Sequence, residues 1–287
     1  MTRILGMGAL AALYWPVLAG MAREWWTDQY AGHGMFVPAF SALLLWMDRD
    51  RLRATAGRGE PAGLLLVGLG LGVLWLGTSA GSLLVQGLSV SLAVAGAVLW
   101  GFGPRCLRVA AFPVSFLAFM VPFPRALVEA VTLDLQLFAA SFAVGALRLF
   151  GIPVFHSGVV IALPSLTLQV AEVCNGLRFL MALVVLTTAF AEVGQRSLPR
   201  KLVLIASAIP IAILANAVRV AAIGLGVYYV GPEAASGTIH NWIGKGVWAL
   251  TLLPLLGIGV LLRRGGGMRQ ARPARPVALL GGEEKIA

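Results

Sequence analysis

Residues 170–190 read VAEVCNGLRFLMALVVLTTAF, a stretch that joins two kinds of sequence. Its second half is an uninterrupted apolar run that dissolves readily in lipid. Its first half holds Glu172, Cys174, Asn175 and Arg178 within seven residues. A backbone inside a bilayer must satisfy its own hydrogen bonds, and a single segment does so only as a helix. The stretch therefore predicts a transmembrane helix with a polar cluster at its entrance.

The rest of the chain is equally apolar. Of its 287 residues, 59% are hydrophobic and only 12% are charged, which is too apolar for a water-soluble globular protein. Runs of the roughly 20 apolar residues that cross a hydrocarbon core of about 30 Å recur along it. We predict an all-α, polytopic transmembrane helical bundle of about eight spans. The spans are expected near 4–22, 35–47, 61–78, 83–102, 109–122, 177–193, 202–222 and 242–262.

The distribution of positive charge predicts how the bundle is oriented. A net charge of +10 would suit a nucleic-acid partner, but most Lys and Arg residues lie in short connections after every second span, where they act as topology signals. We therefore expect no nucleic-acid binding, and we place these connections and both termini in the cytoplasm. The histidines His33, His156 and His240 then fall on the extracytoplasmic side.

The segment 125–150 is long enough to span the bilayer but does not fit this alternation. The span before it has reached the extracytoplasmic face by Pro122, and the helix after Cys174 must start from that same face. We therefore predict a helix lying in the outer interface with one polar side. The residues at helical spacing along that side are Arg125, Glu129, Thr132 and Gln136, whereas Asp134 lies off it.

Two further segments complete the predicted organisation. Residues 151–173 are rich in β-branched residues and carry turn signals at 156–158 and 164–165, which predicts a small extracytoplasmic hairpin. Residues 1–264 are expected to form one transmembrane domain. The basic, Gly- and Pro-rich residues 265–287 are expected to be a disordered cytoplasmic tail.

This topology brings three distant residues to one membrane surface. Cys174 stands at the outer start of the sixth span, Arg219 near the outer end of the seventh and His240 at the outer start of the eighth. Ionisable groups at this depth cost about 2–3 kcal/mol even on permissive scales, so a function is the default interpretation. A helix N-terminus and a nearby cation both lower the pKa of a thiol. The three residues therefore predict thiolate chemistry, with Arg178 one turn after the cysteine as a further cation.

Structural interpretations compete with this one. A lone cysteine in an apolar chain is usually a packing residue, and a lone arginine near a helix end usually reaches toward the headgroups. Arg178 would then serve only to pair with Glu172. A disulfide is not expected, because Cys106 is predicted on the opposite membrane face from Cys174. No CxxC or HExxH spacing occurs, so neither a metal nor another cofactor is expected.

Several sequence blocks together resemble the exosortases and their archaeal relatives, the archaeosortases. The family's Cys-Ser-Gly-Leu-Arg block, preceded by an acidic residue, is similar to EVCNGLR at 172–178, with Asn175 in place of serine. NAVRV with Arg219 and HNWIG with His240 resemble the second and third blocks. Upstream, WWTDQYAGHGMFVP and PVSFLAFMVPFPRALVE resemble two more, so the resemblance runs in family order from about residue 25 to 262.

The resemblance implies a cysteine transpeptidase of the bacterial inner membrane. Its substrates would be secreted proteins that end in a short Pro-Glu-Pro motif, a transmembrane helix and a basic segment. Cleavage would occur at the outer face, often alongside production of extracellular polysaccharide by a separate chain, with membrane lipid as the surroundings. Cys174 would be the nucleophile, Arg219 the stabiliser of the oxyanion or thiolate, and His240 the general acid and base. Substrate-binding or supporting residues would be Glu172, Asn175, Arg178, Asn216, His33 and Asn241.

Two alternatives stay open. An intramembrane thiol protease would use the same nucleophile but end in hydrolysis. A transporter or polysaccharide-export component would instead line an anionic path with Arg178, Arg219 and His240. Transporters usually carry midplane charges on broken helices in two corresponding halves, whereas these polar residues gather at one face.

Overall fold

The computed structural model describes residues 2–170 and 176–264. The predictions made for Glu172, Cys174 and Asn175, and for the tail 265–287, lie outside the described residues.

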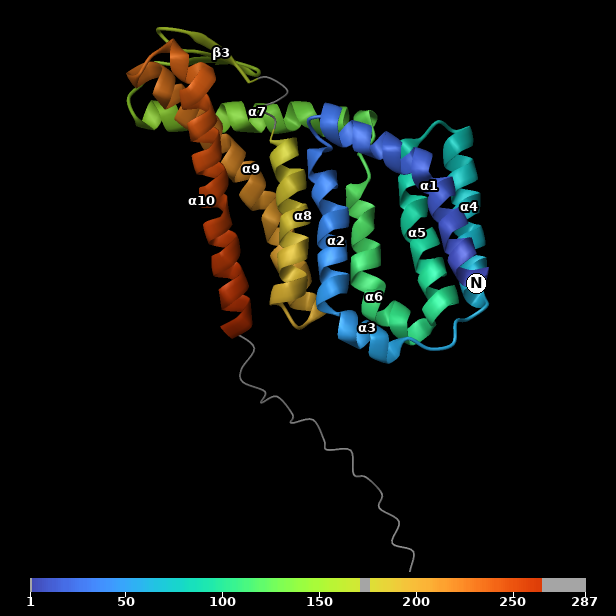
Figure 1. Ribbon diagram of the computed structural model, residues 1–287. Coiled ribbons are helices and arrows are strands. Elements are labelled where there is room, and N and C mark those ends of the chain that lie inside the picture. The colour runs from blue at the N-terminus through green and yellow to red at the C-terminus, as the bar shows by residue number, and fades with distance from the viewer. Residues whose placement is uncertain (1, 171–175, 265–287) are drawn as a thin grey trace, which may run out of the picture.

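In the described part of the chain, eight helices stand side by side and correspond to the eight predicted spans (Figure 1). The prediction of an all-α transmembrane bundle is therefore confirmed. The eight are α1 (Thr2–Thr27), α2 (Phe36–Met47), α4 (Ala62–Ser79), α5 (Leu83–Phe102), α6 (Pro104–Phe116), α8 (Leu177–Gly194), α9 (Leu198–Tyr229) and α10 (Gly237–Arg264). Shorter helical elements connect or extend them: η1 (Gly32–Met35), α3 (Arg49–Thr55), η2 (Leu117–Met120) and η4 (Pro232–Ala235).

Helix α7 (Arg125–Leu149) runs across the ends of the upright helices (Figure 1). Within residues 2–170 and 176–264 it is one of seven helices long and apolar enough to cross a membrane, yet its orientation is that of the predicted interfacial helix. The upright helices α2 and α6 are shorter, and the turns η1 and η2 extend them toward α7. We call the end of the bundle that carries α7 the sheet end. The opposite end, which carries α3 and the α8–α9 connection, is the basic end.

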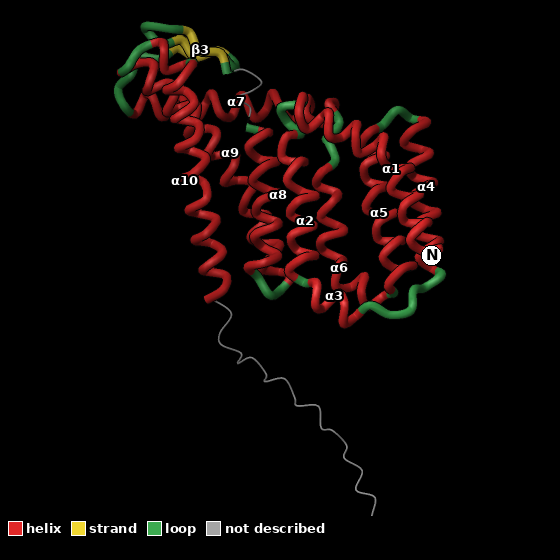
Figure 2. The backbone as a smooth tube through the Cα atoms, in the orientation of Figure 1, coloured by secondary structure: helices red, strands yellow, loops and turns green. Residues whose placement is uncertain are grey.

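A three-stranded antiparallel sheet covers part of α7 (Figure 2). Strands β1 (Phe155–Ser157) and β2 (Val160–Ala162) form the predicted hairpin. The sequence analysis did not anticipate β3 (Thr167–Gln169), which pairs with the other edge of β2. Each of the two turn signals reverses the chain, and two reversals make three strands rather than two.

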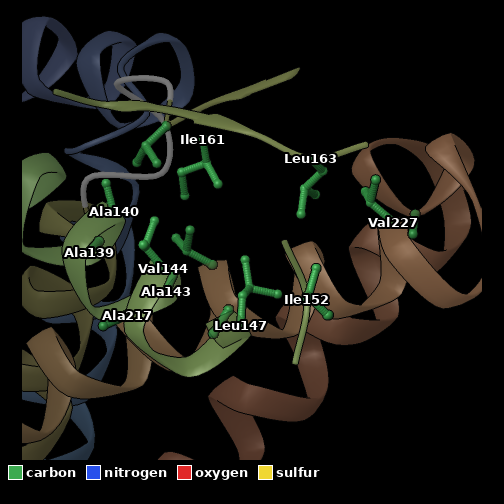
Figure 3. Packing of buried hydrophobic residues seen from close by; sticks show 14 residues of the cluster. Ala139, Ala140, Ala143, Val144, Leu147, Ile152, Ile161, Leu163, Ala217 and Val227 are labelled. Carbon is green, nitrogen blue, oxygen red and sulfur yellow. The ribbon is translucent and has the colours of Figure 1, made fainter. Parts of the chain in front are cut away.

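A small apolar core holds α7 between the sheet and α9 (Figure 3). Ala143 and Leu147 of α7 contribute to it, together with Ile161 of β2 and Ala217 of α9. The alanines have no bulk beyond Cβ, so the crossing helices approach closely. On the same face of α7, Gln136 Nε2 donates a 2.9 Å hydrogen bond to the carbonyl oxygen of Val170. The chain is thus fixed to α7 immediately before the segment that contains Cys174.

The two helices that carry Arg219 and His240 are longer than predicted, as is α1. Helix α9 continues to Tyr229 instead of ending near residue 222, and the chain turns away just beyond it at Gly231, whose φ is 128°. Arg219 therefore lies about 15 Å before the end of its helix rather than close to it. Helix α10 begins at Gly237 instead of near residue 242, which places His240 in its first turn.

Helices α4 and α5 pack through glycines. The buried residues of α4 are Gly63, Gly70 and Gly77, spaced by seven. A Cβ atom at Gly63 would lie 2.3 Å from the Trp100 backbone nitrogen, and one at Gly96 of α5 would lie 2.6 Å from the Val67 nitrogen. Such small residues allow helix backbones to touch in lipid, where close packing drives association.

This packing predicts a difference between two glycine-to-alanine substitutions. We expect Gly96→Ala to lower the free energy of unfolding by about 1–3 kcal/mol, since the methyl group would push two backbones apart. Gly72→Ala is the matched control, because a Cβ there meets nothing within 4 Å. Thermal unfolding in detergent micelles, followed by circular dichroism, measures both. Equal stability of the two variants would contradict the packing.

Candidate functional site

A contact between Arg219 and His240 defines the candidate site. The Nη2 atom of Arg219, on α9, lies 2.9 Å from the Nε2 atom of His240, on α10. A guanidinium has no acceptor atom, so Arg219 donates and the Nε2 lone pair accepts. The geometry therefore corresponds to a neutral imidazole. Gly244, one turn after His240, lies beside the arginine, and a Cβ there would lie 3.4 Å from Nε, an ordinary van der Waals contact.

The start of α8 packs against the same part of α9. Gly176 caps α8 with a φ of 81°, a left-handed conformation that favours glycine. A Cβ atom at this position would lie 2.8 Å from the Cβ of Asn216. Asn216 is buried and precedes Arg219 by one helical turn. The chain thus enters α8 at the level of the Arg219–His240 pair, two residues after Cys174.

A cavity of about 250 Å³ adjoins this contact. Its lining includes the N-cap residue Gly176, Phe179 and Ala182 of α8, and Trp248 of α10. Two guanidinium-bearing residues, Arg178 and Arg219, also line it. Cations that converge on a small and mostly apolar space stabilise negative charge far more than they would in bulk water. The cavity is therefore suited to a group that becomes an anion during a reaction.

The other predicted supporting residues are placed differently. His33 lies in η1 and lines a second, apolar cavity that Arg178 also lines, but not the one beside Arg219. Asn241 is exposed and does not line the cavity, although it follows His240 directly. Glu172, Cys174 and Asn175 lie outside the described residues. The predicted proximity of Arg219 and His240 is confirmed, while the roles of all these side chains stay predictions.

The polar side of α7 borders a separate cleft of about 800 Å³ at the sheet end. Its lining includes all four residues of the predicted stripe, Arg125, Glu129, Thr132 and Gln136. Asp134, predicted to lie off the stripe, instead lines an apolar cavity that involves α8.

Sequence analysis missed two contributors. Asp28, which accepts a 2.7 Å hydrogen bond from the Tyr30 backbone through Oδ1, lines the polar cleft. Trp248 lines the cavity beside Arg219. The signal for Asp28 was its place in the WWTDQYAGHG block. The signal for Trp248 was its spacing of eight residues from His240, which puts both on one face of α10.

Among the described residues, the other side chains that could bind a metal ion or form a disulfide are few. Within residues 2–170 and 176–264, no three His, Cys, Asp or Glu side chains gather where they could hold a metal ion. Cys106 is a free, buried cysteine on α6.

Comparison with protein families identifies the chain. The family described as "Transmembrane exosortase (Exosortase_EpsH)" matches residues 25–257. The chain belongs to the transmembrane exosortase family. The matched region contains all three residues of the candidate exosortase site, Cys174, Arg219 and His240. The exosortase matches neither a curated protein nor a solved structure.

The close approach of α8 and α9 in this exosortase predicts the effect of a methyl group at Gly176. We expect Gly176→Ala to lower the free energy of unfolding by about 1–2 kcal/mol, because an L-residue is strained in the left-handed region and its Cβ would collide with Asn216. Gly246→Ala on α10 is the control, since a Cβ there meets nothing within 4 Å. Thermal unfolding in micelles compares them. If both variants melt together, α8 does not begin against Asn216.

Proposed function

We propose that this exosortase-family membrane protein is a cysteine transpeptidase that uses Cys174 as its nucleophile. The observation that carries the proposal is the 2.9 Å contact between Arg219 and His240 beside Gly176. Two residues span at most about 7 Å, so chain connectivity keeps the Cys174 backbone near Gly176. A thiol, an imidazole and a guanidinium are the groups that covalent acyl transfer requires.

The first half of the reaction forms a thioester. The Arg219 guanidinium first turns from His240 Nε2 toward the substrate, which frees the lone pair of the neutral imidazole. That lone pair then accepts the proton of the Cys174 thiol. The sulfur attacks the peptide carbonyl carbon and the C–N bond breaks. Arg219 donates to the carbonyl oxygen as it becomes negative, and His240 returns its proton to the departing amine.

The second half transfers the acyl group. An acceptor nucleophile enters the cavity, gives its proton to His240 and attacks the thioester carbon. The new C-terminus of the substrate is then bonded to the acceptor. The Cys174 thiolate that leaves takes a proton from His240. If water takes the place of the acceptor, the same residues perform hydrolysis, which is the alternative reaction.

The proposed substrates are secreted proteins that end in a Pro-Glu-Pro motif, a transmembrane helix and a basic segment. Cleavage is proposed at the extracytoplasmic face of the bacterial inner membrane, with the basic end of the bundle in the cytoplasm. The concentration of Arg and Lys at that end, in α3 and in the α8–α9 connection, supports this orientation. Any partner in polysaccharide production is proposed to be a separate chain.

The cysteine substitution tests the proposal. We expect Cys174→Ala to abolish processing of a co-expressed reporter that ends in the three-part signal, while the protein stays in the membrane at normal levels. Cys106→Ala is the control and should process normally, because Cys106 lies on α6, away from the site. Mass spectrometry of the processed end shows whether it is joined to an amine or free. Processing that persists without Cys174 would refute the mechanism.

The shape of the Arg219 side chain predicts a second effect. We expect Arg219→Lys to slow processing by about 10²-fold, the scale of losing one donor to an oxyanion. An ammonium lacks the planar fork of donors that a guanidinium presents to the carbonyl oxygen of the substrate. Arg148→Lys, at the exposed end of α7, is the control. The time course of reporter processing measures both variants. Equal rates would show that Arg219 takes no part in the reaction.

A further inference from the structure

A second cavity joins the one beside Arg219. It has a volume of about 480 Å³ and lies between α2, α8 and α10. The two cavities share Arg178, Ala182 and Trp248 in their linings. The other large apolar cavity near α8 is lined by Leu177, Leu180 and Met181 and shares no lining residue with the Arg219 cavity. Only the α2–α8–α10 groove, of these two, therefore continues into the candidate site.

The groove is apolar along α8 and polar at one end. Beyond Arg178, its α8 lining consists of Ala182, Val185, Leu186 and Ala189, a spacing that covers one helix face. From Arg178 to Ala189 this face extends for about 16 Å along the bundle, away from the sheet end. The polar residues His33 and Arg178 line the groove at the opposite extreme, near the sheet end. An occupant must therefore be apolar over most of its length.

We infer that this groove binds the transmembrane helix of the substrate, an inference that rests on the proposed function. The scissile bond must reach Arg219 while the residues that follow it enter the bilayer. The groove provides that path, because it begins where the site cavity ends. Ala182 and Ala189 have small side chains, which allow a helix backbone to approach α8 as small residues do between membrane helices.

Charge at the mouth of the groove fits the same occupant. Arg178 is exposed and lines both cavities. Within the part of the chain that the structure describes, it forms no ion pair. The acidic motif that precedes the substrate's helix would pass this guanidinium, and a carboxylate there gains a charge-assisted hydrogen bond. The lining of the groove thus follows the order of the sorting signal. Arg178 would meet the acidic motif, and the apolar face would meet the helix that follows it.

Filling the groove tests the inference. We expect Leu186→Trp to slow processing of the reporter by about tenfold or more, since a misplaced substrate loses its alignment with the reacting groups. The side chain of Leu186 is 42% exposed, so the larger ring has room outside the core. Leu69→Trp on α4 is the matched control, since Leu69 is 57% exposed and lines neither cavity. Rates of the two variants within about twofold of each other would overturn the inference.

Crosslinking identifies the occupant directly. In a Cys174→Ala background, which holds the reporter uncleaved, benzoylphenylalanine replaces Leu186 or, as control, Leu69. We expect an adduct from position 186 that maps to the apolar helix of the reporter. An adduct with lipid alone, with a second copy of this chain, or with nothing would overturn the inference. If Cys174→Ala still processes the reporter, the proposed function fails instead, so the two failures are distinguishable.

Discussion

The hydrogen bond between Arg219 and His240 is the interaction on which the candidate site depends. It joins α9 to α10 at a depth where an unpaired ionisable group is costly. Each partner limits the other, because the guanidinium requires an acceptor and the imidazole can accept only while it is neutral. Gly176 then brings the start of α8 close to Asn216, where a Cβ would lie only 2.8 Å away, while Gly244 lies beside the arginine. The polar contact and these glycines together place the start of α8 next to a cationic cavity.

Helix α7 and the sheet act as a cover over this arrangement. The alanines of α7 pack between Ile161 and Ala217, so the cover is attached to the helix that carries Arg219. Gln136 fixes the chain at Val170 on one side of the segment 171–175, and Gly176 fixes it on the other.

Periodicity and charge were sufficient to predict most of the fold. The apolar runs gave the eight upright helices, and the alternation of basic connections required 125–150 to lie crosswise, as α7 does. The same argument brought Arg219 and His240 together without any structural information. The predicted helix ends were less accurate, as α9 shows. A prediction based on the length of apolar sequence that crosses a bilayer does not detect a helix that continues beyond the bilayer. The third strand was missed because short strands depend on pairing with neighbours rather than on their own pattern.

The cavities were beyond sequence reasoning, because their walls come from helices that are distant in the chain. Trp248 illustrates this, since an exposed tryptophan on an apolar helix is usually assigned to the membrane interface. Only the packing of α10 beside α8 turns it into a wall shared by both spaces.

The seven-residue spacing of Gly63, Gly70 and Gly77 has a mechanical consequence. A seam that repeats every seven residues drifts around a straight helix, so two helices that keep it in contact must coil around each other with a left-handed twist. Backbone contact along such a coil leaves little freedom for sliding. The α4–α5 pair would then be rigid. Any movement that admits a large ligand would take place among the other helices of the bundle.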